Sequence, residues 1–228
     1  TGAGVTLREG DPTLKDIVYG SAAQIASRAI FVLDIASAGE AEVKAFCDKV
    51  EKAATERGWL PADPGTTKKV QLTPNEDEGT LTLEINTDVA MEYPMPMYSK
   101  NAVVWGMYLL SQALPNGLEL KNAATGVSNL FFKNCVEGEA YIGKYMGIPS
   151  ELLRNPHDGT ANLTIAPMGT INHEDTSKFP FYDQYTQSLS IPLVIRSIHA
   201  YEDNYNTATQ AVIDACENQG FTLKTKEG

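Results

Sequence analysis

Apolar residues recur with a helical period in several segments of the chain. In residues 40–57 they fall on one face of a helix, and Gly58 follows at a position where helices often end. Residues 206–219 show the same pattern. Residues 12–27 predict a further amphipathic helix, because the preceding Asp11 suits an N-cap and proline suits the first helical position.

A more strongly apolar segment follows a loop in the middle of the chain. Residues 91–98 are apolar but broken by two prolines, so they predict a loop rather than a helix or a central strand. Ser99 then caps a predicted helix over residues 100–114. That helix is apolar on more than one face, which predicts that it packs on both sides.

Other segments have the composition or the alternation of β-strands. Residues 30–36 form a β-rich run, and residues 69–73 and 80–87 flank the acidic turn 74–79, which predicts a hairpin. The rest of the chain is less regular, and we expect strands at 129–136, 161–166, 187–199 and 221–224 and a short helix at 150–154.

One unit of the pattern occurs twice. Residues 30–60 can be laid over residues 192–222 without a gap, so that strand meets strand, helix meets helix, and Gly58-Trp59 meets Gly220-Phe221. Duplication and shared packing logic both explain this match. The elements together predict an α+β fold, with a largely antiparallel sheet and amphipathic helices on one face. We expect a flexible arm over residues 1–11 and a single domain over residues 12–228, with two halves meeting near 115–130 as an alternative.

Charge narrows the classes of partner. The 228 residues carry a net charge of −11, which repels nucleic acid and anionic lipid surfaces. No apolar run is long enough to cross a bilayer. We therefore predict no nucleic-acid partner and no membrane partner.

The first residues and the cysteines bear on localisation. Residues 1–15 lack a basic region followed by an apolar run, so we expect no retained signal peptide, an initiator methionine removed before Thr1, and synthesis in the cytoplasm. Cys47, Cys135 and Cys216 are odd in number and widely spaced, which predicts buried thiols in a reducing compartment.

The candidate chemistry is weak. Residues 138–144 match the spacing of a phosphate-binding loop, but Tyr145 stands where a serine or threonine must reach magnesium. His157 and His173, with neighbouring carboxylates, offer ligands for a transition metal but lack a helical ligand spacing. We find no nucleophile motif, so we predict no catalytic residue, no cofactor and no resident metal.

Large aromatic and methionine side chains gather in predicted loops and strand edges. Satellite core packing and a protein interface both explain such residues, because interface centres favour these types. The interface candidates are Tyr93, Met95, Met97, Tyr98, Phe179, Phe181, Tyr182, Tyr185, Tyr201 and Tyr205.

The C-terminal pattern resembles that of a known group of proteins. In residues 187–224 a long strand leads into the polar bend Tyr201-Glu-Asp-Asn-Tyr205 and an amphipathic helix. This order resembles the ending of bacteriophage tail-terminator and tail-completion proteins. The resemblance implies an α+β subunit that forms rings in a virion and has no catalytic residues.

Three functions follow from these observations. The first is a non-enzymatic assembly subunit, a homo-oligomer that contacts other subunits in a virion tail or neck. The second is a module that binds a small ligand or a protein. The third is a metal-dependent hydrolase that uses His157 and His173.

Overall fold

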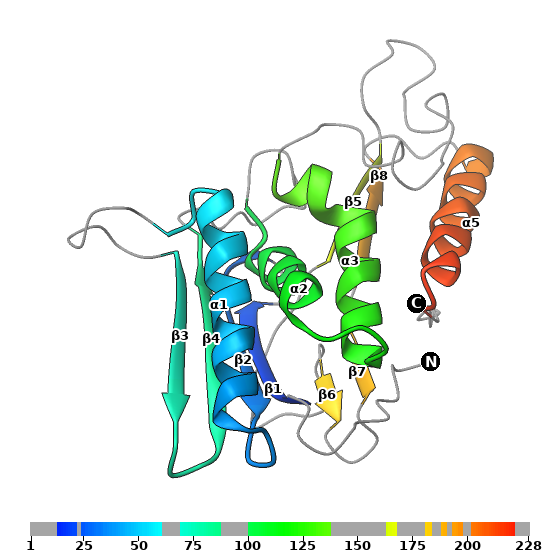
Figure 1. Cartoon of the computed structure of the whole chain (residues 1–228). Coiled ribbons are helices and arrows are strands. Elements are labelled where there is room, and N and C mark those ends of the chain that lie inside the picture. Colours follow the sequence, from blue (N-terminus) through cyan, green and yellow to red (C-terminus); the bar gives the residue numbers. More distant parts are fainter. Residues whose placement is uncertain are drawn as a thin grey trace.

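The chain has an α+β fold (Figure 1). The computed structural model describes residues 13–21, 24–60, 69–87, 100–137, 163–167, 181–183, 188–190, 193–197 and 202–221. In chain order, the elements within these residues are β1 (Thr13–Ser21), β2 (Gln24–Asp34), α1 (Glu40–Glu56), β3 (Val70–Asn75), β4 (Thr80–Asn86), α2 (Ala102–Ala113), α3 (Glu119–Cys135), β5 (Leu163–Pro167), β6 (Phe181–Asp183), β7 (Ser188–Ser190), β8 (Leu193–Ser197) and α5 (Glu202–Asn218).

The main sheet has four antiparallel strands in the order β1-β2-β4-β3. Its two central strands alternate strictly, so that every second side chain faces the core. Phe31 and Leu33 of β2 and Leu83 and Ile85 of β4 are fully buried in this way. The predicted hairpin of residues 69–87 is confirmed, and its first strand, β3, forms one edge of the sheet.

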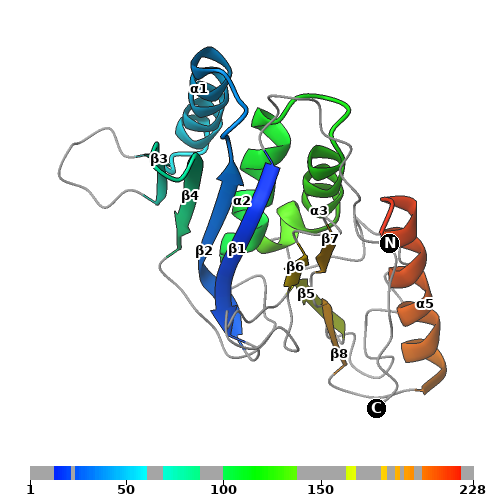
Figure 2. The same ribbon diagram turned by 90° about the horizontal axis from the view of Figure 1, so that it is seen from below.

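The core lies between this sheet and the helices. Both α1 and α2 cover the same face of the sheet, and α3 packs against α2 (Figures 1 and 2). Almost every residue of α2 is buried, which confirms the prediction of packing on both sides. Close approach of α2 to β2 requires Gly106, because a Cβ there would lie 2.0 Å from Cε2 of Phe31.

The C-terminal elements pair among themselves and contact the main fold at α3 and β1. Strand β5 pairs with β8 and β6 pairs with β7, both antiparallel. Helix α5 lies against α3, where Gly126 faces the ring of Phe221 and the Asn129 side chain donates a hydrogen bond to Gln219 at 3.1 Å. The C-terminal elements therefore contact the main fold at α3, through α5, and at β1, through β6.

The two matching sequence segments share local structure. Both α1 and α5 have 17 residues and follow an antiparallel strand. Gly58 after α1 and Gly220 after α5 have φ angles of 68° and 86°, the left-handed region that suits glycine. The next residue donates its N–H to the last turn in each case, Trp59 to Ala54 at 2.9 Å and Phe221 to Cys216 at 3.0 Å. The sequence pattern predicts a second strand after Gly58, but residues 59–60 belong to the helix cap and not to a strand.

Two predicted elements have the wrong type. Residues 12–27 were expected to be a helix, but the described part forms β1 and the start of β2, which pair as antiparallel strands. Residues 129–136 were expected to be a strand, but they end α3, where Leu130, Phe131 and Asn134 are buried on one helical face. In both segments, packing against neighbours decides the structure where local propensity is ambiguous.

Boundaries also differ from the prediction. The predicted strand 187–199 is divided between β7 and β8, which pair with different strands. Helix α5 begins at Glu202, earlier than expected. The N-cap of α2 is Asn101, whose side chain accepts hydrogen bonds from the N–H groups of Val103 and Val104 at 3.1 and 3.3 Å. The predicted arm 1–11, the loop 91–98, the Ser99 cap and the helix 150–154 lie outside the described residues.

Candidate functional site

Strand β3 forms one edge of the main sheet. The N–H of Asn86 donates to the C=O of Lys69 at 2.8 Å, which fixes the residues of β3 that bond to β4. Hydrogen-bonded and non-bonded pairs alternate in an antiparallel ladder, so Lys69, Gln71, Thr73 and Asn75 bond to β4. The backbone groups of Val70, Leu72 and Pro74 therefore point away from β4. Proline has no N–H, and Val70 is only 3% exposed, so the least covered outward donor is that of half-buried Leu72.

A groove runs beside this edge. It has a volume of about 300 Å³ and is lined by Glu51 of α1, by Leu60 and by residues 70–73 of β3. The side chains of Val70 and Leu72 contact the core on the α1 side of the sheet. Glu51 is the only ionisable residue among those that line the groove. The groove is therefore mixed in character, with the apolar side chains of Leu60, Val70 and Leu72 beside the polar ones of Gln71, Thr73 and Glu51.

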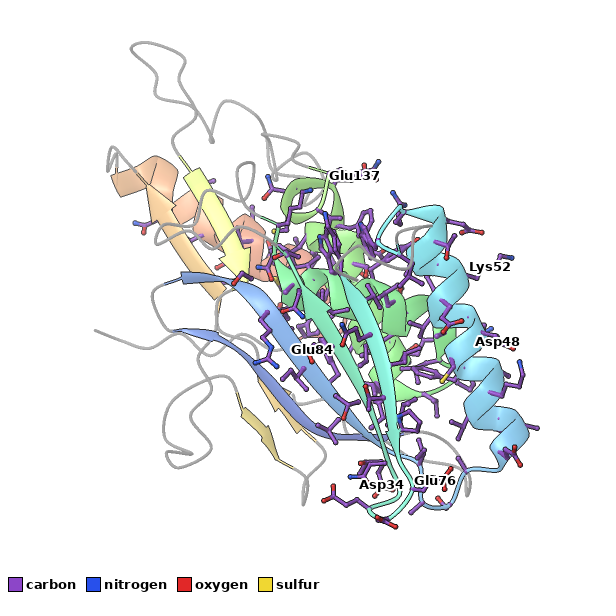
Figure 3. The ribbon with its side chains drawn as sticks, turned by 90° about the vertical axis from the view of Figure 1, so that its left-hand side faces the viewer. Asp34, Asp48, Lys52, Glu76, Glu84 and Glu137 are labelled. Atoms are coloured by element: carbon purple, nitrogen blue, oxygen red, sulfur yellow. The ribbon has the colours of Figure 1, made fainter. Side chains whose placement is uncertain are left out.

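The two ends of β3 carry opposite charges. Lys69 directly precedes the strand, and the turn Glu76-Asp77-Glu78 directly follows it. All three acidic residues are exposed, and Figure 3, which looks onto this side of the molecule, shows Glu76 at the tip of the hairpin. Gly79 closes the turn with a φ of 61°, and its C=O accepts the N–H of Ile35 at 2.9 Å. The hairpin tip is thereby held to the rest of the sheet.

An aromatic cluster includes Trp59, the residue before the groove residue Leu60. Trp59 and Trp105 stack with their ring centroids 3.8 Å apart, and Tyr108 meets the Trp59 ring edge-on at 5.8 Å. The C=O of Trp59 accepts the N–H of Lys69 at 3.3 Å. Through this bond the residue that precedes β3 is tied to the buried surface of α2, so the edge strand has a fixed position.

Arg57 and Glu137 form an ion pair beside the same cluster. The Arg57 guanidinium lies 4.6 Å from the Phe132 ring centroid and donates to the Glu137 carboxylate at 2.8 Å. Glu137 also accepts a hydrogen bond from Lys133. Lys133 most strongly, and Arg57 after it, hold the pKa of Glu137 below its usual range, although partial burial acts in the opposite direction. These contacts fasten the end of α1 to α3.

The predicted burial is confirmed for two of the three cysteines. Cys135 and Cys216 are buried, and Cys47 is half-buried on α1. Burial raises the pKa of the Cys216 thiol to about 11 and raises that of Cys135 further. Within the described residues, no group of three or more His, Cys, Asp or Glu side chains is arranged to hold a metal ion.

The structure bears on few of the residues singled out in the sequence. Phe181 and Tyr182 lie in β6 and Tyr205 lies in α5. The remaining candidates lie outside the described residues, namely the phosphate-loop match 138–144, His157, His173, Tyr93, Met95, Met97, Tyr98, Phe179, Tyr185 and Tyr201. Their interface and metal roles stay predictions.

Sequence reasoning missed the edge strand as a site. The signal was present, because Pro74 lies inside a strand and proline is tolerated in sheets chiefly at edges. The opposite charges at the two ends of the strand were also visible. Which strand forms an edge depends on the sheet order, and that order follows from pairings distant in sequence.

Comparisons with known proteins add no family. No model of a known protein family matches the chain, and no curated protein matches it. Among the described helices, none is long and apolar enough to cross a membrane.

Proposed function

We propose that this chain is a non-enzymatic assembly subunit that joins neighbouring polypeptides through the β3 edge of its main sheet. One observation carries the proposal. The outward N–H of half-buried Leu72, on an edge strand, lies beside a groove lined by Glu51, Leu60, Gln71 and Thr73, which together offer main-chain bonding and side-chain contact to an added strand.

The resemblance of residues 187–224 to tail-terminator and tail-completion proteins supports placing this assembly in a virion tail or neck. In that setting the subunit is made in the cytoplasm and then incorporated into a particle. It contacts copies of itself and other subunits of the same structure.

Light scattering after size-exclusion chromatography, run over a series of protein concentrations, tests the proposal. We expect the average mass to rise with concentration. Leu72→Pro removes an outward N–H and should reduce this rise, whereas Leu72→Ala is the matched control, because it shortens the same side chain and keeps the N–H. A mass that stays at 24.8 kDa at the highest concentration would contradict the proposal.

A second candidate function is a peptide-binding module, which the same groove favours. An extended peptide that adds to β3 would place alternate side chains beside Leu60 and Glu51. In that case the protein alone would stay a monomer, and a peptide with an apolar residue and a lysine two positions apart would bind the wild type and bind the Leu72→Pro variant more weakly.

A further inference from the structure

The turn between α2 and α3 holds an asparagine directly before a glycine, a pair that occurs once in the sequence. We propose that Asn116 is a site of spontaneous deamidation, at which the folded chain acquires aspartate and isoaspartate with time. The reaction requires neither the assembly function nor the β3 edge, so the two proposals can fail separately.

The chemistry needs only these two residues and water. The main-chain nitrogen of Gly117, after losing its proton, attacks the side-chain carbonyl carbon of Asn116. A C–N bond forms and ammonia leaves, which gives a five-membered succinimide. Water then opens the ring: breaking the new bond gives aspartate, whereas breaking the original peptide bond gives isoaspartate, in which the main chain runs through the side chain.

The structure leaves both reacting groups accessible. Asn116 and Gly117 are exposed, and neither forms a hydrogen bond to another described residue that would hold the amide or block the nitrogen. A Cβ added at Gly117 would have no neighbouring atom of the described residues within 4 Å. The φ of Gly117 is 91°, so the turn itself favours the residue that hinders the attack least.

Asn122 shows the contrast within the same molecule. It is also exposed, but it lies inside α3, and Ala123 follows it. The N–H groups inside a helix are engaged in hydrogen bonds, and the helical main chain cannot rearrange into a ring without breaking them. Exposure alone therefore does not make an asparagine of this chain reactive.

The connection between α2 and α3 has little room for an extra main-chain atom. Its two ends, Leu114 and Leu118, are only 1% and 3% exposed. Between them, Nζ of Lys121 donates a hydrogen bond to the C=O of Leu114 at 2.9 Å. Isoaspartate adds one atom to the main chain between these fixed ends, so the packing of α2 on α3 must shift. Aspartate adds only a charge to an exposed turn, and its effect is small.

Ageing of the purified protein tests the site. The folded chain is kept in mildly alkaline buffer, which favours loss of the Gly117 proton. Isoaspartate is then measured with an isoaspartyl methyltransferase and by mass spectrometry of the peptides. We expect at least about ten-fold more isoaspartate at residue 116 than at residue 122. Asn116→Gln is the matched variant, because it keeps an amide but requires a less favourable six-membered ring, and it should lose most of the signal.

The same chain unfolded in guanidinium chloride provides the reference rate. Because the turn is open, the rate at Asn116 in the folded protein should lie within about ten-fold of the rate in the unfolded chain. Conversion in guanidinium chloride without conversion in the folded protein would overturn the proposal, since the fold would then protect Asn116.

Urea denaturation tests the effect on the helices. Ion exchange isolates the deamidated protein by its added negative charge, and the methyltransferase measures its isoaspartate content. Asn116→Asp is the matched control, because it has the same charge and a normal main chain. We expect the isoaspartate form to unfold at a lower urea concentration than Asn116→Asp, which should stay close to wild type. Equal midpoints would show that the connection accommodates the extra atom and would overturn the predicted shift of α2 on α3.

Discussion

At the scale of single residues, Gly106 limits how the core can change. A Cβ added at Gly106 would lie 2.0 and 2.4 Å from two atoms of the Phe31 ring, and that ring is fully buried. Gly106→Ala should lower the free energy of unfolding by about 1–3 kcal/mol, because the helix and the strand must move apart. Urea denaturation followed by circular dichroism measures this change.

The Phe31→Leu substitution provides the control. It removes the ring atoms that an alanine at 106 would meet, so the double variant should be more stable than the sum of the two single effects predicts. If the two changes in the free energy of unfolding are additive, the cost of Gly106→Ala does not come from the Phe31 ring.

Glu137 gives a pH-dependent contribution at the same scale. Because Lys133 and Arg57 hold its folded pKa below the unfolded value, Glu137 stabilises the fold above about pH 4.3, and the contribution is lost as the pH falls through the folded pKa. Glu137→Gln should cost about 0.5–1 kcal/mol at pH 7, a value limited by the partial exposure of these side chains. Urea titrations at several pH values should show the difference from wild type shrinking in acid. A difference of constant size down to pH 3 would contradict this account.

At the scale of elements, a single substitution can test the small contact between α3 and α5. A Cβ at Gly126 would lie 2.7 Å from Cε2 of Phe221 and 3.3 Å from Cβ of Gln219. Gly126→Ala should therefore loosen α5, although alanine itself favours α3 by about 1 kcal/mol. Hydrogen exchange separates these effects, because the amides of α5 should exchange faster while those of α1 should not.

Phe221→Leu is the matched change for this contact. In that background Gly126→Ala should leave the exchange of α5 nearly unchanged, since the ring that it would meet is gone. Faster exchange throughout α1 as well would show a general loss of stability and would contradict a local effect.

Elements differ in how far the sequence predicted them. Helix α1 and the β3–β4 hairpin were correct, because each has one clear period and strong end signals such as Gly58 and the turn 76–79. The segment that became β1 was wrong, because Ile17 and Val18 fit a helical face and also fit a strand. Pairing with β2 decides in favour of the strand. The local pattern of apolar residues does not show which segment a strand will pair with.

At the scale of the whole molecule, the sequence predicted the α+β class and not the site. The groove exists because β4 lies between β2 and β3, which leaves β3 at the edge beside α1. Strand order is set by side chains far apart in sequence, such as Phe31 against Leu83. The charges beside β3 and its proline are visible in the sequence. Only the strand order shows that they belong to an edge strand.

The three thiols can report whether the molecule unfolds as one unit. Only thiolates react readily, and burial raises the pKa of Cys216 to about 11 and that of Cys135 further, so both should react only after a structural opening. In the described contacts, α5 meets the core through α3, whereas α3 packs broadly on α2. Cys216 should therefore become reactive at urea concentrations below the global transition, and Cys135 only within it. Half-buried Cys47 should react first and without urea.

Alkylation in increasing urea, read out by mass spectrometry of the cysteine peptides, measures this order. Gly126→Ala should lower the urea concentration at which Cys216 reacts and leave that for Cys135 closer to the wild-type value, because it acts on the α3–α5 contact. Simultaneous labelling of Cys216 and Cys135 in both proteins would mean that α5 unfolds only together with the core. The contact at Gly126 would then be part of a single cooperative unit, in spite of its small size.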